Sequence, residues 1–466
     1  MKTFLFSFCL IICVLNASAQ TNIRISATKY NGDALTLYQY DNYLTKNEKQ
    51  LATCQIDSAG NASVNVDIDD IQCLFMRYEK LIYYFFVQPN SNIIVEFSEK
   101  ELFTEKEKLN PFSEPLFISA NVIPASDGNF NQQIIDTDNK SNDAILAVAK
   151  YKKENDKHFK DSLLNIFKNS ITESENQFVN DYTKYRIAAI EYLFKSKPLK
   201  NLQNEYFVGK PILYQNPAYC ELLIEINDKY FLHRSQQAQG NVFRQALNKG
   251  NLSKIREMLS KNNDYLYSKD FCDFLILQNA YSEFYDSSFS RSALLEIVNS
   301  VANETTNANN KKIAEDIRNT IVKLLAGYAA PDFELEDIDG NTKSLKSFSD
   351  KYIYLGFFSV NSYGSIQDFY LIDMLSKKFG DKIHFISICV DDKKDVENFM
   401  KSEKFNWTFL LCNNSSGILK KYDVRAFPTY YLIDKNGKFI KSPAPSPSED
   451  INKVFDENKL NNEIND

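Results

Sequence analysis

Two short stretches near the C-terminus constrain the fold more than any other part of the chain. The first, Lys351 to Phe369 (KYIYLGFFSVNSYGSIQDF), is an apolar run that breaks into a Ser/Asn/Gly turn and continues as an amphipathic pattern. This order predicts a buried strand, a tight turn and the N-terminus of a helix. The second, Val424 to Asp434 (VRAFPTYYLID), places Pro428 at the start of another apolar strand. Together the two stretches predict an α/β domain.

The order and spacing of these stretches resemble the active site of the TlpA/ResA-like and AhpC/TSA redoxin families, which have the thioredoxin fold. In those families the turn reads F-W-x-x-W-C-x-x-C and faces a cis-proline before a later strand. The matching residues here run from Phe357 to Ser365, so Ser362 and Ser365 stand where the family has its two redox cysteines. The tryptophans that usually surround the cysteines are also absent from the turn. From Gly327 onwards, the other expected elements of the family have counterparts in the sequence.

The two serines argue against dithiol chemistry at this turn. A CxxC pair works because a thiolate at a helix N-terminus has a lowered pKa and attacks a disulfide, after which the second thiol releases the product. A serine hydroxyl ionises far above neutral pH and cannot form a mixed disulfide. Ser362 as a nucleophile would need a base, and the sequence identifies none. We therefore expect no catalytic residue at Ser362 or Ser365, and no cofactor or metal.

The resemblance implies that Pro428 is cis and that the backbone on either side of it pairs with extended polypeptides. Tyr363 in the turn, together with Phe427 and Thr429 beside the proline, forms a mixed apolar and polar surface in this reading. Such a surface suits peptide binding by edge and groove contacts. Two alternatives remain open: a proline that only shapes the loop, and a turn under no functional demand.

Residues 1–19 have the pattern of a secretory signal peptide. Lys2 gives a cationic start, an apolar core follows, and Ala17-Ser18-Ala19 is a cleavage site that predicts a mature chain beginning at Gln20. The apolar core is too short to cross a bilayer as a permanent helix. Lipoprotein processing at Cys13 is less favoured, because a bulky isoleucine precedes it. We expect an exported, periplasmic protein without a transmembrane segment.

The rest of the chain predicts a multidomain protein. Residues 20–100 contain short β-branched and aromatic runs between polar turns, which predict an all-β sandwich. This segment is similar to the β-sandwich that often precedes a TlpA-like domain in exported proteins of the Bacteroidetes. Residues 101–326 are predicted to be mainly helical, with an irregular start where prolines discourage helix and the helices proper running from about Ser141 to Leu325. Residues 327–466 form the predicted thioredoxin-like domain.

Six cysteines follow the leader, and none is part of a C-x-x-C pair. Buried free thiols are the favoured interpretation, with a Cys54–Cys73 disulfide between neighbouring predicted strands as an alternative. Cys412 is predicted to lie at a more exposed strand end, where it could be a reactive thiol. The full set is Cys54, Cys73, Cys220, Cys272, Cys389 and Cys412.

Two functions fit the sequence. The first is a redox-inactive protein of the cell envelope that binds or scaffolds an exported polypeptide or an envelope protein. The second is a periplasmic thiol-disulfide oxidoreductase, or a thiol-dependent antioxidant protein, that uses a cysteine outside a CxxC motif, such as Cys412. The formal charge of -7 without a basic stripe argues against nucleic acid as a partner. The oligomeric state is not specified.

Overall fold

The computed structural model describes residues 20–78, 80–97, 103, 114–124, 130–260, 268–403, 405–412, 416–449 and 451–457. The predicted signal peptide at residues 1–19 lies outside this set, so the leader and the periplasmic location stay predictions. No helix in the described ranges combines the length and the apolar character that crossing a membrane requires. The chain divides into two compact units, one built from residues within 1–100 and 116–226 and the other including residues 227–466. The division into domains at residues 100 and 326 stays a prediction.

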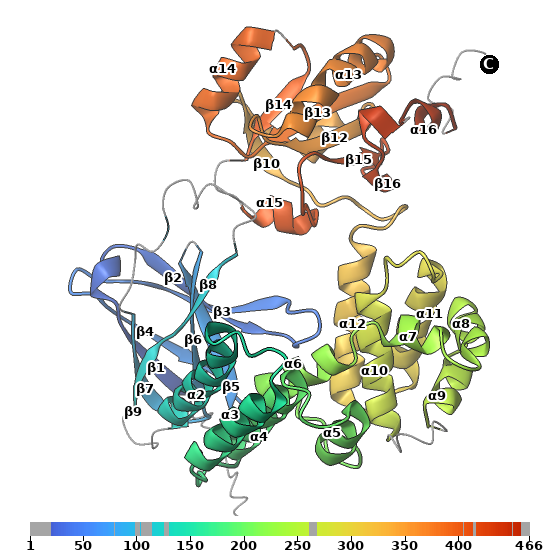
Figure 1. Ribbon diagram of the computed structural model, residues 1–466. Coiled ribbons are helices and arrows are strands. Elements are labelled where there is room, and N and C mark those ends of the chain that lie inside the picture. Colours follow the sequence, from blue (N-terminus) through green and yellow to red (C-terminus); the bar gives the residue numbers. More distant parts are fainter. Residues whose placement is uncertain are drawn as a thin grey trace, which may run out of the picture. The chain divides into compact units, whose positions relative to one another are not determined.

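Two β-sheets form the N-terminal part of the first unit (Figure 1). One sheet has four strands in the order β4-β1-β7-β9, and the other has five in the order β3-β2-β5-β6-β8. The β-rich prediction is confirmed, whereas the packing of the two sheets as a sandwich stays a prediction. The elements are β1 (Thr21–Ser26), a 3-10 turn (Thr28–Tyr30), β2 (Ala34–Tyr40), β3 (Glu48–Gln55), β4 (Asn61–Val66), β5 (Gln72–Tyr78), β6 (Leu81–Val87), β7 (Asn92–Glu96), β8 (Leu116–Ser119) and β9 (Asn121–Pro124).

Strands β8 and β9 lie in the segment that the sequence predicts to be irregular. Each is an edge strand: β8 pairs in parallel with β6, and β9 pairs antiparallel with β7. Proline discourages helix but is tolerated at a sheet edge, where its missing N–H leaves no ladder bond unmade. Pro124, the last residue of β9, has such a position.

The helical prediction for the middle of the chain is confirmed, but the first helix begins at Phe130 and not near Ser141. The side chain of Asn131 accepts a hydrogen bond from the backbone N–H of Phe86 and donates one to its carbonyl, both 2.8 Å long. This contact with β6 ties the start of the helix to the sheet. The helices are α2 (Phe130–Lys150), α3 (Lys157–Ser170), α4 (Gln177–Leu193), α5 (Leu199–Tyr206), α6 (Pro217–Ile226), α7 (Tyr230–Ser235), α8 (Gly240–Asn248), α9 (Leu252–Ser260), α10 (Lys269–Ser282), α11 (Arg291–Glu304) and α12 (Ala308–Val322).

The C-terminal part of the chain is built on a seven-stranded mixed sheet in the order β11-β10-β14-β13-β12-β15-β16. Strands β12, β13 and β14 are parallel. β10 pairs antiparallel with β14 and β15 with β12, and the edge strands β11 and β16 pair antiparallel with β10 and β15. The elements are β10 (Glu334–Asp337), β11 (Thr342–Ser344), a 3-10 turn (Leu345–Phe348), β12 (Tyr352–Phe358), α13 (Tyr363–Phe379), β13 (Ile383–Cys389), α14 (Lys393–Glu403), β14 (Thr408–Leu411), α15 (Ser416–Lys421), β15 (Thr429–Ile433), β16 (Phe439–Ala444), a second 3-10 turn (Pro447–Glu449) and α16 (Ile451–Glu457).

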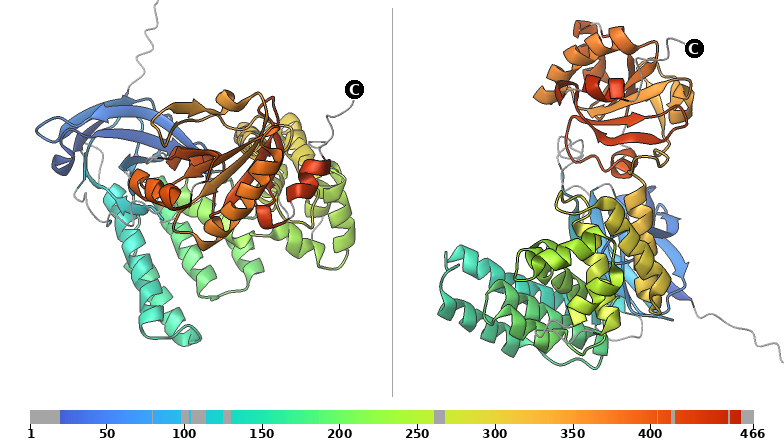
Figure 2. Two further views of the ribbon diagram at one scale, coloured as in Figure 1. Left: turned by 90° about the horizontal axis from the view of Figure 1, so that it is seen from above. Right: turned by 90° about the vertical axis from the view of Figure 1, so that its right-hand side faces the viewer.

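Strand β12 lies inside this sheet and is buried on both faces. On one face Leu355 and Phe357 pack with residues of α15, and on the other Tyr354 and Phe358 pack with residues of α13, α14 and α16. Figure 2 shows these helices arranged around the sheet. A strand covered on both faces needs a continuous apolar run, which the sequence YIYLGFF provides. The turn after Phe358 therefore begins at the end of a strand that is packed on both faces.

Candidate functional site at the Ser362 turn

The predicted strand, turn and helix are present at Lys351 to Phe369. Ser362 is the N-cap of α13, with extended backbone angles, and its hydroxyl accepts a hydrogen bond from the N–H of Ser365 at 3.5 Å. Serine is a preferred N-cap because its oxygen can satisfy one of the free N–H groups of the first turn. Ser365 is fully buried, and its hydroxyl has no hydrogen-bond partner among the described residues.

Pro428 lies opposite the first turn of α13. The Phe427–Pro428 peptide bond is cis, as the resemblance implied. The Ser362 hydroxyl donates a 3.3 Å hydrogen bond to the carbonyl of Phe427, and a Cβ atom added to Gly364 would lie 3.3 Å from Cδ of Pro428. The structure thus brings together two segments that are more than sixty residues apart in the chain.

The other predicted binding residues surround this contact. Tyr363 is the first residue of α13, and 76% of its surface is exposed. Phe427, Pro428 and Thr429 are half-buried. Thr429 begins β15, and its hydroxyl donates to the carbonyl of Ala426 at 2.7 Å, which closes the loop before the strand. Together these residues form an accessible surface, which consists of the exposed Tyr363 ring and the half-buried loop from Phe427 to Thr429.

Asp391 is a structural residue of the site that sequence reasoning missed. Its carboxylate accepts hydrogen bonds from the Ser359 hydroxyl at 2.9 Å, the Val360 N–H at 2.7 Å and the Asn361 side-chain amide at 3.0 Å. It thereby holds most of the turn between β12 and α13. The position of Asp391 just after the strand Ile383–Cys389 could have indicated this role. Neighbouring parallel strands end at the same edge of a sheet, so an acidic residue just after β13 lies beside the end of β12.

A second missed feature is a buried carboxyl group on α13. Asp368 is 6% exposed and accepts a 3.1 Å hydrogen bond from the hydroxyl of Tyr430 on β15. The Tyr430 ring stacks on that of Tyr354, with centroids 5.1 Å apart and planes 4° from parallel. Burial raises the pKa of Asp368 above its ordinary value, although the hydrogen bond from Tyr430 opposes the shift. No sequence motif connects these three residues.

The cysteines of this domain do not place an exposed thiol at the turn. Cys389 is buried, its thiol donates to Asp391 at 3.1 Å, and burial raises its pKa well above the ordinary value. Cys412 is 6% exposed, so the prediction of an exposed strand end is wrong. The side chains of Cys389 and Cys412 belong to the apolar clusters on opposite faces of the sheet. They are therefore directed away from each other and do not form a dithiol pair.

All six cysteines of the described chain are free thiols. Five of them are buried, which confirms the prediction of buried free thiols, and the sixth, Cys73, is half-buried. The alternative of a Cys54–Cys73 disulfide is wrong, because strand β2 lies between β3, which carries Cys54, and β5, which carries Cys73. Within the described ranges, no group of three or more histidine, cysteine, aspartate and glutamate side chains could hold a metal ion.

Comparison with known proteins identifies the family. A model of the AhpC/TSA family matches residues 326–442. The thioredoxin-like protein YneN of Bacillus subtilis is 25% identical over 118 residues, which are 25% of this chain and 69% of YneN. The thiol-disulfide oxidoreductase ResA of Bacillus thuringiensis subsp. konkukian is 30% identical over 122 residues, which are 26% of this chain and 69% of ResA.

A solved structure is also similar: a thiol:disulfide interchange protein from Bacteroides sp. is 21% identical, covers 30% of this chain and 94% of its own, and has a TM-score of 0.28. The family-model match includes the Ser362 turn and Pro428. The chain belongs to the ResA/TlpA-like redoxins of the AhpC/TSA family.

Proposed function

We propose that this chain is an exported protein of the cell envelope that binds or scaffolds a polypeptide at the Ser362 turn and carries out no thiol–disulfide exchange there. One observation carries the proposal. Hydroxyl groups occupy both the N-cap and the first turn of α13, opposite cis-Pro428, where the family's reaction needs sulfur. Exchange requires a thiolate that attacks one disulfide sulfur and is later displaced by a second thiol. A serine hydroxyl can do neither.

The surface around the turn supports a binding role. Tyr363 presents an exposed ring of the kind that dominates many protein interfaces, because a tyrosine brings large contact area with little conformational entropy to lose. The carbonyl of Phe427 accepts a 3.3 Å hydrogen bond from the Ser362 hydroxyl, which is long for an O–H donor. A backbone N–H of an extended polypeptide could replace that bond, as in other modes of strand addition.

The burial of the thiols argues against the alternative, an oxidoreductase that uses a cysteine outside a CxxC motif. Reactive cysteines need a lowered pKa and access to solvent. Burial instead raises the pKa of Cys272 to about 11 and that of Cys73 to about 12. It also raises the pKa of Cys54, Cys220 and Cys389. Because a raised pKa leaves little thiolate at neutral pH, these groups are poor nucleophiles.

Binding of an unfolded polypeptide without free thiols tests the proposal. The probe is fluorescein-labelled insulin B chain, reduced and carboxymethylated so that it cannot form a disulfide, and the readout is fluorescence anisotropy with the full chain. We expect Tyr363→Ala to weaken binding about tenfold, the usual effect of removing an aromatic anchor. Met374→Ala is the matched control, since Met374 is a large side chain of the same helix that is 59% exposed. Equal binding by both variants, or no binding by the intact chain, would contradict the proposal.

A further inference from the structure

The four-stranded sheet of the first unit has one face on which most side chains are polar. Along β1, β4 and β7, buried isoleucines and valines alternate with residues that are half-buried or exposed, as expected for a sheet covered on one side only. The second set of residues defines the outer face. At its centre Arg24 of β1 is opposite Ser63 of β4 on one side and Ile94 of β7 on the other.

Asparagine is concentrated on this face. Among the strands within the described ranges, asparagine occurs only in the four-stranded sheet, and every instance is exposed or half-buried there. The five are Asn22, Asn61, Asn65, Asn92 and Asn121. Asparagine is depleted in strands because its side chain competes for backbone hydrogen bonds. The other asparagines within the described ranges lie outside strands, so a general richness in asparagine does not explain the cluster, and departures from local preference are typical of functional sites.

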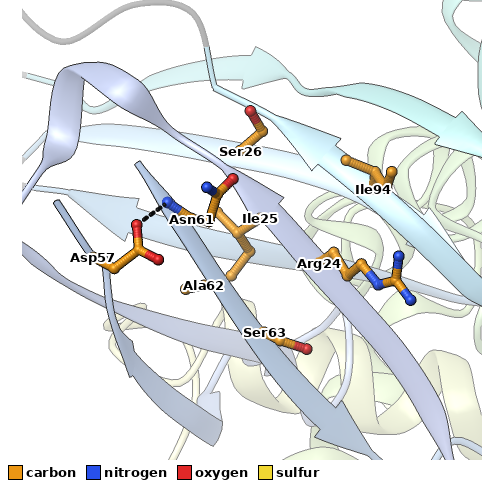
Figure 3. A pocket seen from close by; sticks show the side chains of 8 residues that line it. All are labelled: Arg24, Ile25, Ser26, Asp57, Asn61, Ala62, Ser63 and Ile94. Carbon is orange, nitrogen blue, oxygen red and sulfur yellow. Dashed lines mark hydrogen bonds between the residues drawn. The ribbon is translucent and has the colours of Figure 1, made fainter. Parts of the chain in front are cut away.

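A hollow of about 470 Å³ lies on this face. Figure 3 shows Asp57 at one end of it and Arg24 at the other, with Asn61 and Ser26 between them and Ser63 along one side. The Asp57 carboxylate accepts the N–H groups of Ala59 and Asn61 through a single oxygen, both at 2.9 Å, so the turn before β4 fixes its position. The volume is within the range of small-molecule sites.

One polar group of the lining, the Ser63 hydroxyl, is held by a neighbour on the same face. The side-chain amide of Asn22 donates to the hydroxyl oxygen of Ser63 at 3.0 Å and to the amide oxygen of Asn65 at 2.7 Å. In these bonds the oxygen atoms of Ser63 and Asn65 are acceptors. The O–H group of Ser63 and the side-chain N–H groups of Asn65 are not used in them. Ile94 adds an aliphatic surface to the lining. The face therefore combines ordered donors and acceptors with a small apolar area.

We infer that this hollow binds a neutral saccharide. Each sugar hydroxyl both donates and accepts a hydrogen bond, and the lining supplies a carboxylate that accepts, a guanidinium that donates, and hydroxyl and amide groups that do both. The C–H groups of a sugar ring fit the aliphatic surface of Ile94. Among the residues that line the hollow, the positive charge of Arg24 is balanced by the negative charge of Asp57, which favours a ligand without net charge. The site is independent of the Ser362 turn.

Saturation-transfer NMR with the full chain tests this inference, with maltohexaose, cellohexaose and mannohexaose as neutral probes and hexagalacturonate as an anionic one. We expect transfer to at least one neutral hexasaccharide. Arg24→Ala should weaken that binding about tenfold or more, the usual effect of losing hydrogen bonds from a charged group. Lys49→Ala is the matched control, because Lys49 is an exposed cation on β3 of the other sheet. It should leave binding unchanged.

Three results would overturn the inference. The first is no transfer to any neutral hexasaccharide from the intact chain. The second is transfer to hexagalacturonate alone, which would make the hollow an anion site. The third is equal binding by the intact chain and by the Arg24→Ala and Ser26→Ala variants, which would place the sugar elsewhere.

Discussion

The hydroxyl of Ser362 donates a 3.3 Å hydrogen bond to the carbonyl of Phe427, the residue whose peptide bond to Pro428 is cis. The contact joins the N-cap of α13 to the loop before β15. An oxygen atom thus makes a structural bond at a position where, by resemblance, relatives carry a reactive sulfur. This contact underlies our proposal that the chain keeps the family's architecture at this point without its thiol chemistry.

Asp391 should be needed to hold the turn. Because its carboxylate accepts bonds from three residues of the turn and from the Cys389 thiol, Asp391→Ala leaves a backbone N–H and three side chains without their acceptor. We expect the free energy of unfolding of this domain to fall by about 1–3 kcal/mol. Urea titration followed by the fluorescence of Trp407, the one tryptophan of the chain, measures this directly. Asp381→Ala removes an exposed carboxylate just before β13 and serves as the control; an equal loss in both variants would refute the role of Asp391.

Asp368 should make the stability of the domain depend on pH. Burial raises the pKa of this carboxyl in the folded protein above the ordinary value of 3.8, so the folded state binds its proton more tightly than the unfolded state. The resulting stability is fully present below pH 3.8 and is lost as the pH rises through the raised pKa of the folded protein.

Asp368→Asn keeps an acceptor for Tyr430 but removes the titration. Relative to the intact chain, this variant should gain stability as the pH rises above 3.8 and reach a constant advantage at higher pH. Urea titrations between pH 3 and pH 8 give the difference between the two curves. A difference that stays constant with pH would show that Asp368 does not titrate in this way.

Gly356 should be intolerant of a side chain. A Cβ atom added at this position in β12 would lie 2.7 Å from Cε1 of Tyr430, inside a packed core. Overpacking of this kind costs about 1–3 kcal/mol, so Gly356→Ala should lower the urea midpoint of the Trp407 signal. Gly417→Ala in α15 is the control, because no atom lies within 4 Å of the added carbon. It should be neutral or stabilising by about 0.5–1 kcal/mol; a similar loss in both would contradict the packing argument.

Much of the C-terminal domain could be predicted because its signals are local. The apolar run of β12, the turn at Ser362 and the proline before β15 each occupy a few consecutive residues, and their order alone indicates the family. Asp391 and the Asp368–Tyr430 pair could not be found in this way. Their partners lie about 30 and 62 residues away, and only the fold brings them together.

Two other differences have similar causes. Cys412 was expected to be exposed because polar residues follow it, yet it packs against Ile418 and Leu419 of α15, a helix that the sequence did not predict. Strands β8 and β9 were missed because their stability comes from pairing with β6 and β7, which lie earlier in the chain. For β8 and β9, contacts distant in sequence override the local pattern, whereas Cys412 is covered by a helix that follows within a few residues.

Reduction of insulin by dithiothreitol, measured with the intact chain, tests the central claim most directly. The double variant Ser362→Cys with Ser365→Cys is the positive control, since the Ser365 hydroxyl has no hydrogen-bond partner to lose within the described part of the chain and the helix N-terminus favours a thiolate at position 362. The intact chain should leave the rate at its uncatalysed value, and the double variant should accelerate it. Acceleration by the intact chain would contradict the account.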